Sequence, residues 1–325
     1  MPFWQKNMQR ICGLYKKGGY CMEYVKITEN LTMSRIIQGF WRLTDWNWDT
    51  ETLAEFMRGC IARGVTTFDT AEIYGNTVCE TEMGKVFEKY PEIREKIQLV
   101  TKTGIKKIAG MPYGDGKVVK IAKHYDTRYE TIKQACRDSI ERLHCGYIDL
   151  YLIHREDPLL DPHAAAKALL ELKAEGLVKE IGVSNFDPFK FNALNNCTGG
   201  QLVVNQIEFN PTCYEHINSG MLDLLLEKQI HPMIWSPLAG GKIFTSDEEP
   251  YAKVRAVLEE IAERHGTSPE TILYAWILYH PVGMLPLVGS NKLHRLDNAI
   301  VALDVKLEHW EWYEIYLATG EKRMR

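Results

Sequence analysis

A chain of 325 residues with 45% hydrophobic and 25% charged residues has the composition of a globular protein. Its formal net charge of -4 gives no sign of nucleic acid or an anionic membrane as a partner, which leaves a small molecule as the expected ligand. No run approaches the roughly eighteen apolar residues that a membrane-spanning helix needs. We therefore expect a cytoplasmic protein without a membrane partner.

The 8 cysteines include no Cys-x-x-Cys pair and no zinc-finger spacing. A chain of this length does not need disulfides to hold its core together. Free thiols in a reducing compartment, and no metal site, are the expected state.

The N-terminal segment lacks a sustained hydrophobic period. Residues 1–22 are basic, and the first convincing strand begins only after Ser34. We expect residues 1–33 to be an N-terminal extension that is partly or wholly disordered, and residues 34–325 to form one domain.

From Ser34 onward, short β-branched or aromatic runs alternate with longer helical patterns, which is typical of repeated βα units and a parallel sheet. The expected strands are Ile36 to Phe40, Thr66 to Asp69, Gln98 to Lys102, Ile148 to Ile153, Glu180 to Val183, Val203 to Gln206, His231 to Trp235 and Leu285 to Val288.

Helix signals fall between these strands. Capping residues or proline precede apolar residues at helical spacing, and glycines stand where helices must end. The expected starts are Asp49-Thr50, Thr127 and Ser268-Pro269-Glu270, and the expected ends are near Gly64, Gly146 and Gly176.

Eight such units favour a (β/α)8 TIM barrel over an open sheet, and no Gly-x-Gly-x-x-Gly follows an early strand as a dinucleotide-binding open sheet requires. Two connections, 106–125 and 239–249, are longer than usual, and long loops at this rim build substrate sites. The aromatic-rich segment 307–325 is expected to form a final helix and tail that packs on the barrel and closes over its mouth.

Four polar side chains follow the ends of successive strands: Asp69, Tyr74, Lys102 and His154. A carboxylate at a buried strand end needs a cation nearby, and Lys102 on the next strand can supply it. We expect the ammonium to lower the pKa of the Tyr74 phenol, so that Tyr74 serves as a general acid near neutral pH.

His154 can donate a second hydrogen bond to a substrate carbonyl oxygen. No serine or cysteine accompanies these residues as a nucleophile, so a hydride from a bound cofactor is the natural attacking group. The residues predict reduction of a C=O group.

The motifs that carry these side chains resemble those of the aldo-keto reductases, in the right order from about Ser34 to Asp304. They are Phe68-Asp69-Thr70-Ala71 with Tyr74-Gly75, Thr101-Lys102-Thr103, Leu152-Ile153-His154, Gly182-Val183-Ser184-Asn185-Phe186, Asn205-Gln206, Trp235-Ser236-Pro237-Leu238 and Gly289-Ser290.

The resemblance implies a (β/α)8 barrel and NADPH-dependent reduction of an aldehyde or ketone, with Asp69, Tyr74, Lys102 and His154 as a catalytic tetrad and Tyr74 as its proton donor. It also implies a set of cofactor-binding residues. Those for the nicotinamide are Ser184, Asn185, Gln206 and Trp235; those for the pyrophosphate are Ser236 and Leu238, with Gly240-Gly241-Lys242 as a flexible closing loop; those for the 2'-phosphate are Ser290, Arg295 and Lys292.

This chain departs from the family pattern at two places. Gly289 stands where many members have Lys, and Arg155 stands where others often have Trp. Since that Trp lines the substrate pocket of those members, the resemblance does not carry their substrates over to this chain.

Two other functions stay open at this level. A barrel aldolase or lyase would use Lys102 as a Schiff base, which the charge of Asp69 opposes. A cofactor-binding regulatory subunit on the same fold would not need an intact tetrad. Taken singly, each tetrad residue has a plainer role: a turn or helix cap for Asp69, a solvated side chain for Lys102, a structural group for His154 and a loop aromatic for Tyr74.

Overall fold

The computed structural model describes residues 8–11, 21–108, 110–113, 117–118, 120 and 123–320. The chain divides into two compact units. The first unit comprises Met1–Gly39, Gly59–Thr67 and Gln206–Arg325, and the second comprises Phe40–Arg58 and Phe68–Asn205. Each is described by itself.

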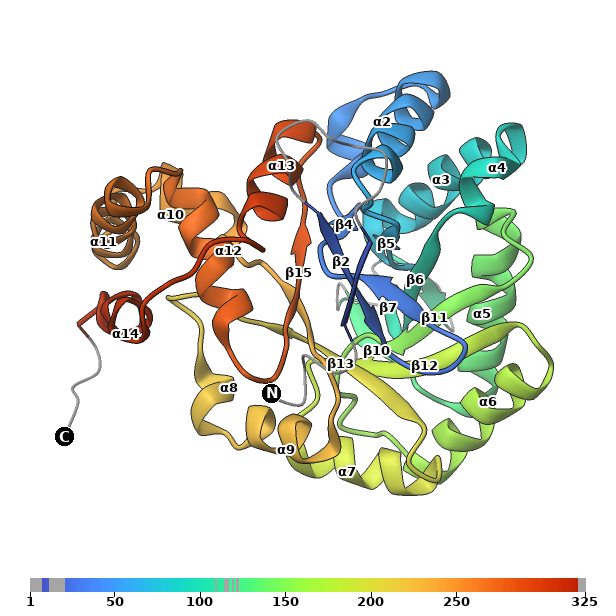
Figure 1. Cartoon of the computed structure of the whole chain (residues 1–325). Helices are drawn as coiled ribbons and strands as arrows, with labels where there is room; N and C mark the ends of the chain where they lie inside the picture. Colours follow the sequence, from blue (N-terminus) through green and yellow to red (C-terminus); the bar gives the residue numbers. More distant parts are fainter. Residues whose placement is uncertain are drawn as a thin grey trace. The chain divides into compact units, whose positions relative to one another are not determined.

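Eight parallel strands pair in chain order to form a closed barrel, the last pairing with the first (Figure 1). All eight expected strands are confirmed, with ends that differ by at most two residues. They are β4 (Ile37–Gly39), β5 (Thr67–Asp69), β6 (Gln98–Thr103), β11 (Ile148–Ile153), β12 (Val178–Ser184), β13 (Leu202–Glu208), β14 (Met233–Trp235) and β15 (Leu285–Val288).

The register of three central strands determines which side chains are neighbours at the strand ends. Lys102 on β6 is level with Leu152 on β11, which in turn is level with Gly182 on β12. Side chains alternate between the two faces of a strand, so Thr101 and Thr103 face the opposite way from Lys102. A Cβ at Gly182 would lie 2.6 Å from Val204 Cγ1, which explains why this position has no side chain.

Helices of the second unit pack apolar stripes against these strands. In α5, Ile132, Ala135 and Cys136 are buried as expected, but Ile140 is only partly buried and the helix begins at Tyr129, not directly after Thr127. The helices that lie wholly or partly in this unit are η1 (Leu43–Trp46), α2 (Thr50–Ala62), η2 (Tyr74–Thr77), α3 (Val78–Lys89), α4 (Pro91–Glu95), α5 (Tyr129–Leu143), α6 (Pro162–Ala174) and α7 (Pro188–Cys197).

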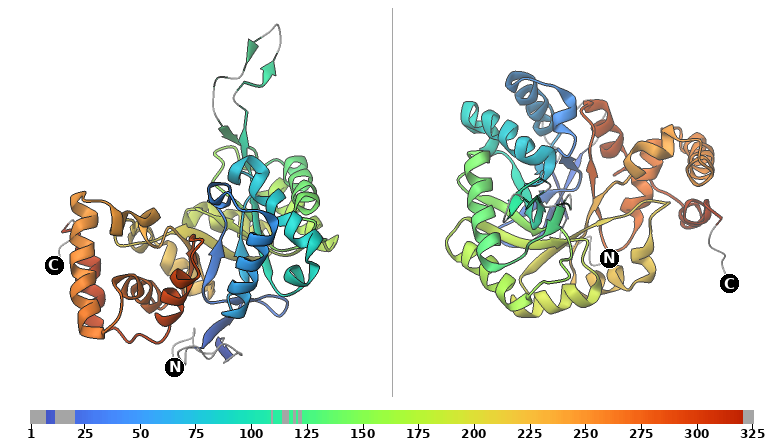
Figure 2. Two further views of the ribbon diagram at one scale, coloured as in Figure 1. Left: turned by 90° about the horizontal axis from the view of Figure 1, so that it is seen from above. Right: turned by 180° about the vertical axis from the view of Figure 1, so that it is seen from behind.

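The connection after β6 contains paired strands where the sequence predicted a long loop. β7 (Ile105–Lys107) pairs antiparallel with β10 (Lys123–Tyr125), and β8 (Pro112–Tyr113) with β9 (Lys117–Val118). Figure 2 (left) shows these blue-green strands extending beyond the end of β6. Residues 109, 114–116, 119 and 121–122 of this connection lie outside the described part.

The first unit holds the remaining helices. Ser268 caps α12 as predicted, its Oγ accepting a hydrogen bond from the Thr271 amide at 3.1 Å. The expected loop 239–249 is corrected: it contains two short helices, with Lys242 as the first residue of α10. The elements are α8 (Glu215–Asn218), α9 (Met221–Lys228), η3 (Ala239–Gly241), α10 (Lys242–Thr245), α11 (Glu249–His265), α12 (Pro269–Tyr279), α13 (Leu293–Val301) and α14 (His309–Leu317).

A small antiparallel sheet precedes the barrel. It consists of β1 (Met8–Ile11), β2 (Met22–Lys26) and β3 (Thr32–Ser34), in that order. The buried side chains of Met22, Val25 and Met33 hold its second and third strands to the core of this unit. Residues 1–7 and 12–20 of the expected extension lie outside the described part, so its disorder stays a prediction.

The C-terminal helix α14 packs on α12. Trp276 and Trp312 stack with centroids 5.4 Å apart, and each indole donates a hydrogen bond to the other residue's carbonyl oxygen, at 3.0 and 3.2 Å. The final helix is therefore confirmed, while residues 321–325 of the expected tail lie outside the described part.

Three expectations from composition can be compared with the structure. In the described ranges no helix combines the length and apolar character needed to cross a membrane, and no group of three His, Cys, Asp or Glu side chains could hold a metal ion. Six described cysteines are free thiols, but Cys21 is disulfide-bonded, which corrects the expectation of free thiols at that position.

Candidate active site

The last residue of β5 and a buried lysine of β6 form an ion pair. Lys102 Nζ lies 2.7 Å from Asp69 Oδ1, and both residues are almost wholly excluded from solvent, with exposed fractions of 0% and 1%. The same ammonium donates a hydrogen bond to the Thr70 carbonyl oxygen at 2.8 Å. Asp69 therefore has the cation that a buried carboxylate requires.

Tyr74 is the first residue of the 3-10 helix η2, and its hydroxyl is the third group that the Lys102 ammonium contacts. Lys102 Nζ is 3.3 Å from Tyr74 Oη. The backbone then passes through positive φ at Gly75, with a value of 55°. A Cβ there would approach Thr44 Cγ2 to 2.5 Å, so the turn that presents Tyr74 requires glycine on both counts.

The expected lowering of the Tyr74 pKa is wrong. Burial raises the pKa of this phenol well above its ordinary value of 10.0, the Asp69 carboxylate raises it further, and the Arg155 guanidinium opposes them. The sequence analysis weighed the charge of the ammonium but not the burial of the phenol, and desolvation of the phenolate dominates. Tyr74 is therefore protonated at neutral pH.

His154 follows β11 and faces Tyr74. Their rings are 5.6 Å apart at an angle of 75°, and the His154 amide continues the strand ladder by donating to the Thr103 carbonyl oxygen at 2.8 Å. Burial, followed by the charges of Lys102, Arg155 and Lys123, lowers its pKa well below 6.5. The imidazole is therefore neutral at neutral pH.

The Nδ1 atom of His154 is buried and has no hydrogen-bond partner among the described residues. A buried polar atom without a partner costs free energy unless a ligand or water satisfies it. This side chain therefore has hydrogen-bonding capacity available for a ligand.

Ser184 and Asn185, two of the expected cofactor-binding residues, adjoin His154 at the end of β12. The Asn185 side-chain amide donates to the His154 carbonyl oxygen at 3.2 Å and to Ser184 Oγ at 2.7 Å. Asn185 has a φ of 60°, the left-handed conformation that asparagine tolerates better than most residues. The structure thus brings these two and the tetrad together in the second unit.

The first unit carries the other expected cofactor-binding residues. Gln206 is buried on β13, and Trp235 ends β14 with Ser236 following at a φ of 50°. Asn210 fixes that turn by donating from Nδ2 to the Ser236 carbonyl oxygen at 3.0 Å. Leu238 is partly exposed just before η3.

The segment expected to bind a 2'-phosphate forms the start of α13. Ser290 Oγ accepts a hydrogen bond from the Lys292 amide at 3.1 Å, and Lys292 is exposed at the N-cap position. Arg295 pairs with Glu270, its Nη1 lying 2.5 Å from Glu270 Oε2. This acid was read from the sequence only as part of a helix start.

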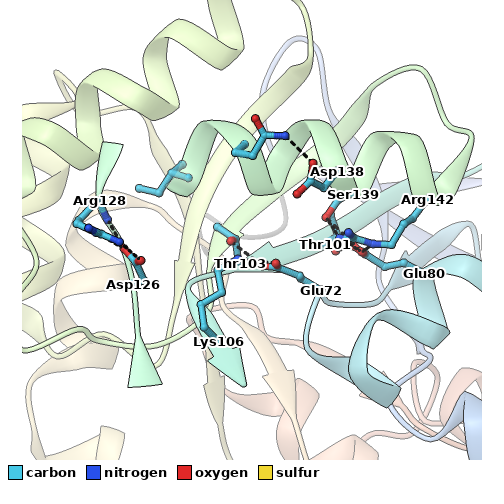
Figure 3. A network of polar contacts seen from close by, with 12 residues as sticks. Glu72, Glu80, Thr101, Thr103, Lys106, Asp126, Arg128, Asp138, Ser139 and Arg142 are labelled. Atoms are coloured by element: carbon cyan, nitrogen blue, oxygen red, sulfur yellow. Dashed lines mark hydrogen bonds and ion pairs between the residues drawn. The ribbon is translucent and has the colours of Figure 1, made fainter. Parts of the chain in front are cut away.

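The sequence reading also missed Glu72, which lies between Asp69 and Tyr74. Its carboxylate contacts Thr103 and Lys106, as Figure 3 shows. The signal available was its place: an acidic residue two positions before the expected proton donor.

The fold and the site define a (β/α)8 barrel protein that carries a buried Asp–Lys pair, a phenol and an imidazole at its strand ends. Comparison with known proteins gives the family: residues 35–316 match the model of the Aldo/keto reductase family, to which this chain belongs. It is therefore an oxidoreductase of a family that acts on small-molecule carbonyl substrates.

Curated relatives agree with that assignment. An uncharacterized oxidoreductase of Bacillus subtilis, YcsN, is 40% identical over 91% of this chain and 98% of its own length. A 6-dehydroglucose reductase of Agrobacterium fabrum is 37% identical over 93% and 99%.

Solved structures show the same fold. A thermostable aldo-keto reductase in complex with the inhibitor epalrestat is similar with a TM-score of 0.74 and 24% identity, covering 91% of this chain and 99% of that one. A glycerol dehydrogenase from Gluconobacter oxydans has a TM-score of 0.76 and 21% identity, covering 91% and 95%.

Proposed function

We propose that this protein reduces an aldehyde or ketone to an alcohol with NADPH, and that Tyr74 donates the proton. The observation that carries the proposal is the position of one buried ammonium. Lys102 Nζ contacts both Asp69 and the Tyr74 hydroxyl, and the Tyr74 ring lies next to His154.

Each member of the tetrad has a role that fits its surroundings. His154, neutral and with hydrogen-bonding capacity available, donates to the substrate oxygen and polarises the carbonyl. Tyr74 keeps its proton until negative charge develops on that oxygen. An alkoxide is a far stronger base than a phenolate, so the raised pKa of Tyr74 does not prevent the transfer. Lys102 then stabilises the phenolate left behind.

NADPH supplies the hydride when it is bound. The side-chain amides of Asn185 and Gln206 offer both donors and acceptors, which suits a carboxamide. Ser184, Trp235, Ser236 and Leu238 complete this proposed set. Arg295, Ser290 and Lys292 would bind the 2'-phosphate, for which a guanidinium beside an exposed lysine is suited.

The geometry opposes the Schiff-base alternative. The Lys102 ammonium donates to Asp69 Oδ1, the Thr70 carbonyl oxygen and Tyr74 Oη, which together use all three of its N–H groups. Burial lowers the pKa of Lys102, and Asp69 opposes this shift. The Lys102 side chain is nevertheless 0% exposed. An amine so enclosed has no access for a carbonyl carbon.

The proposed substrate is a small carbonyl compound, and oxidised sugars belong in the test panel because two relatives, 37% and 30% identical, are named 6-dehydroglucose reductases. We propose a cytoplasmic setting from the composition alone.

The experiment is NADPH consumption with a panel of aldehydes, ketones and oxidised sugars, repeated with NADH. Tyr74→Phe should lower the reduction rate at least about 100-fold, the lower range for loss of a general acid, while NADPH still binds as measured by its fluorescence. Full activity of that variant would refute the assigned proton donor. Tight NADPH binding without turnover on any panel member would favour a regulatory subunit.

A further inference from the structure

We propose that Glu72 is a positioning residue that holds the Tyr74 hydroxyl against Lys102, an inference that rests on the proposed reductase function. It acts by fastening the turn that carries Tyr74 to the strand that carries Lys102.

Glu72 makes three contacts with the end of β6 and the residues just after it. Its amide donates to the Lys102 carbonyl oxygen at 3.0 Å, its Oε2 accepts from Thr103 Oγ1 at 2.9 Å, and its Oε1 lies 2.5 Å from Lys106 Nζ. The Glu72 side chain is only 12% exposed, so these contacts are largely shielded from water. Figure 3 shows Glu72 beside Thr103 and Lys106.

These contacts matter because the far side of the turn adopts backbone conformations that need support from surrounding contacts. After Tyr74 the chain passes through three residues with positive φ, of which Asn76 at 57° and Thr77 at 73° are not glycine. Such conformations persist only where surrounding contacts hold them. Glu72, two residues before Tyr74, supplies such contacts on the near side.

The strand geometry connects the fastening to the chemistry. Thr103 is adjacent to Lys102, and alternation along β6 sends the two side chains to opposite faces. Lys102 thus reaches Tyr74 Oη from one face while Thr103 holds Glu72 from the other. Two neighbouring residues on opposite faces of β6, Lys102 and Thr103, therefore together fix the 3.3 Å distance between Lys102 Nζ and Tyr74 Oη.

A second glutamate, which accepts a hydrogen bond from a threonine on the same face of β6, provides a matched comparison. Thr101 Oγ1 donates to Glu80 Oε1 at 2.6 Å, and Glu80 also pairs with Arg142 of α5, as Figure 3 shows. Thr101 and Thr103 are both buried, with exposed fractions of 0% and 1%, and both donate to a glutamate. Glu80 lies in α3, beyond the end of η2, and joins α3 to α5 and to β6.

The experiment compares Thr103→Val with Thr101→Val, and Glu72→Ala with Glu72→Gln. In steady-state reduction of an aldehyde, Thr103→Val and Glu72→Ala should lower kcat at least about 10-fold with KM for NADPH changed less than about 2-fold, because misplacing a proton donor affects the chemical step. Glu72→Gln retains an acceptor for Thr103 and should recover part of kcat. Thr101→Val should stay within about 2-fold of the parent kcat.

Circular dichroism and thermal midpoints show whether each variant is folded, and Thr103→Val decides the matter if Glu72→Ala does not fold. An active parent with a Thr103→Val variant as active as Thr101→Val would overturn the role of Glu72 alone. Absence of carbonyl reduction by the parent chain would overturn the proposed function, and the role of Glu72 with it.

Discussion

Replacing Lys102 with methionine tests how far the site depends on one buried charge. Methionine fills a similar volume but carries no ammonium, so the Asp69 carboxylate, 1% exposed, would stay in the barrel without a cation. The Thr70 carbonyl oxygen would also lose the hydrogen bond that it accepts from Nζ at 2.8 Å. Both effects act in the same direction and lower stability.

The size of the effect follows from the geometry. Removing one partner of a buried ion pair costs about 3–5 kcal/mol, mostly because the remaining charge is left uncompensated. If that is the cause, neutralising the remaining carboxylate should restore stability. The double variant Lys102→Met with Asp69→Asn should therefore be more stable than Lys102→Met alone by about 2 kcal/mol or more.

Urea unfolding followed by far-ultraviolet circular dichroism measures the free energy of unfolding of the parent, the two single variants and the double variant. Lys85→Met is the control, since it breaks an ion pair with Glu82 in which the lysine side chain is 51% exposed, and it should change the free energy of unfolding far less. A loss below about 1 kcal/mol for Lys102→Met, or a double variant no more stable than that single variant, would refute the reasoning.

Three further predictions concern pH, cofactor choice and packing. The rate of carbonyl reduction should be nearly constant from about pH 6 to pH 9, because burial keeps the pKa of Tyr74 above its ordinary 10.0. The rate of alcohol oxidation should rise with pH, because Tyr74 must then accept a proton. A reduction rate that falls steadily above about pH 7 would contradict this. Arg295→Ala, which also frees Glu270, should raise KM for NADPH at least about 10-fold and KM for NADH less than about 2-fold, and equal changes would exclude a 2'-phosphate contact. Gly84→Ala would place a Cβ 1.9 Å from the Arg142 carbonyl oxygen, so α3 and α5 must separate and the thermal midpoint should fall by about 2 °C or more; an unchanged midpoint would contradict the close approach.

Local pattern was sufficient for the order of elements and for the choice of candidate residues. A strand has a period of two and a helix a period of 3.6, so alternation of the two patterns located all eight barrel strands. The ion pair of Asp69 with Lys102 could be predicted from the sequence because parallel strands in a barrel end at the same rim. The ion pair at 2.7 Å confirms that step.

Pattern was insufficient where a property depends on how much water is excluded or on which distant groups meet. The pKa of Tyr74 is raised because packing desolvates the phenol, and the sequence pattern does not predict how deeply this side chain is buried. The apolar residues of the 106–125 connection do not alternate regularly with polar ones, so the sequence pattern did not predict the pairing of β7 with β10. The sequence by itself therefore determined the strand order and the four candidate side chains, because both follow from local periodicity. Only the tertiary structure decided their protonation and the contacts of Glu72, because these depend on desolvation and on residues brought together from different parts of the chain.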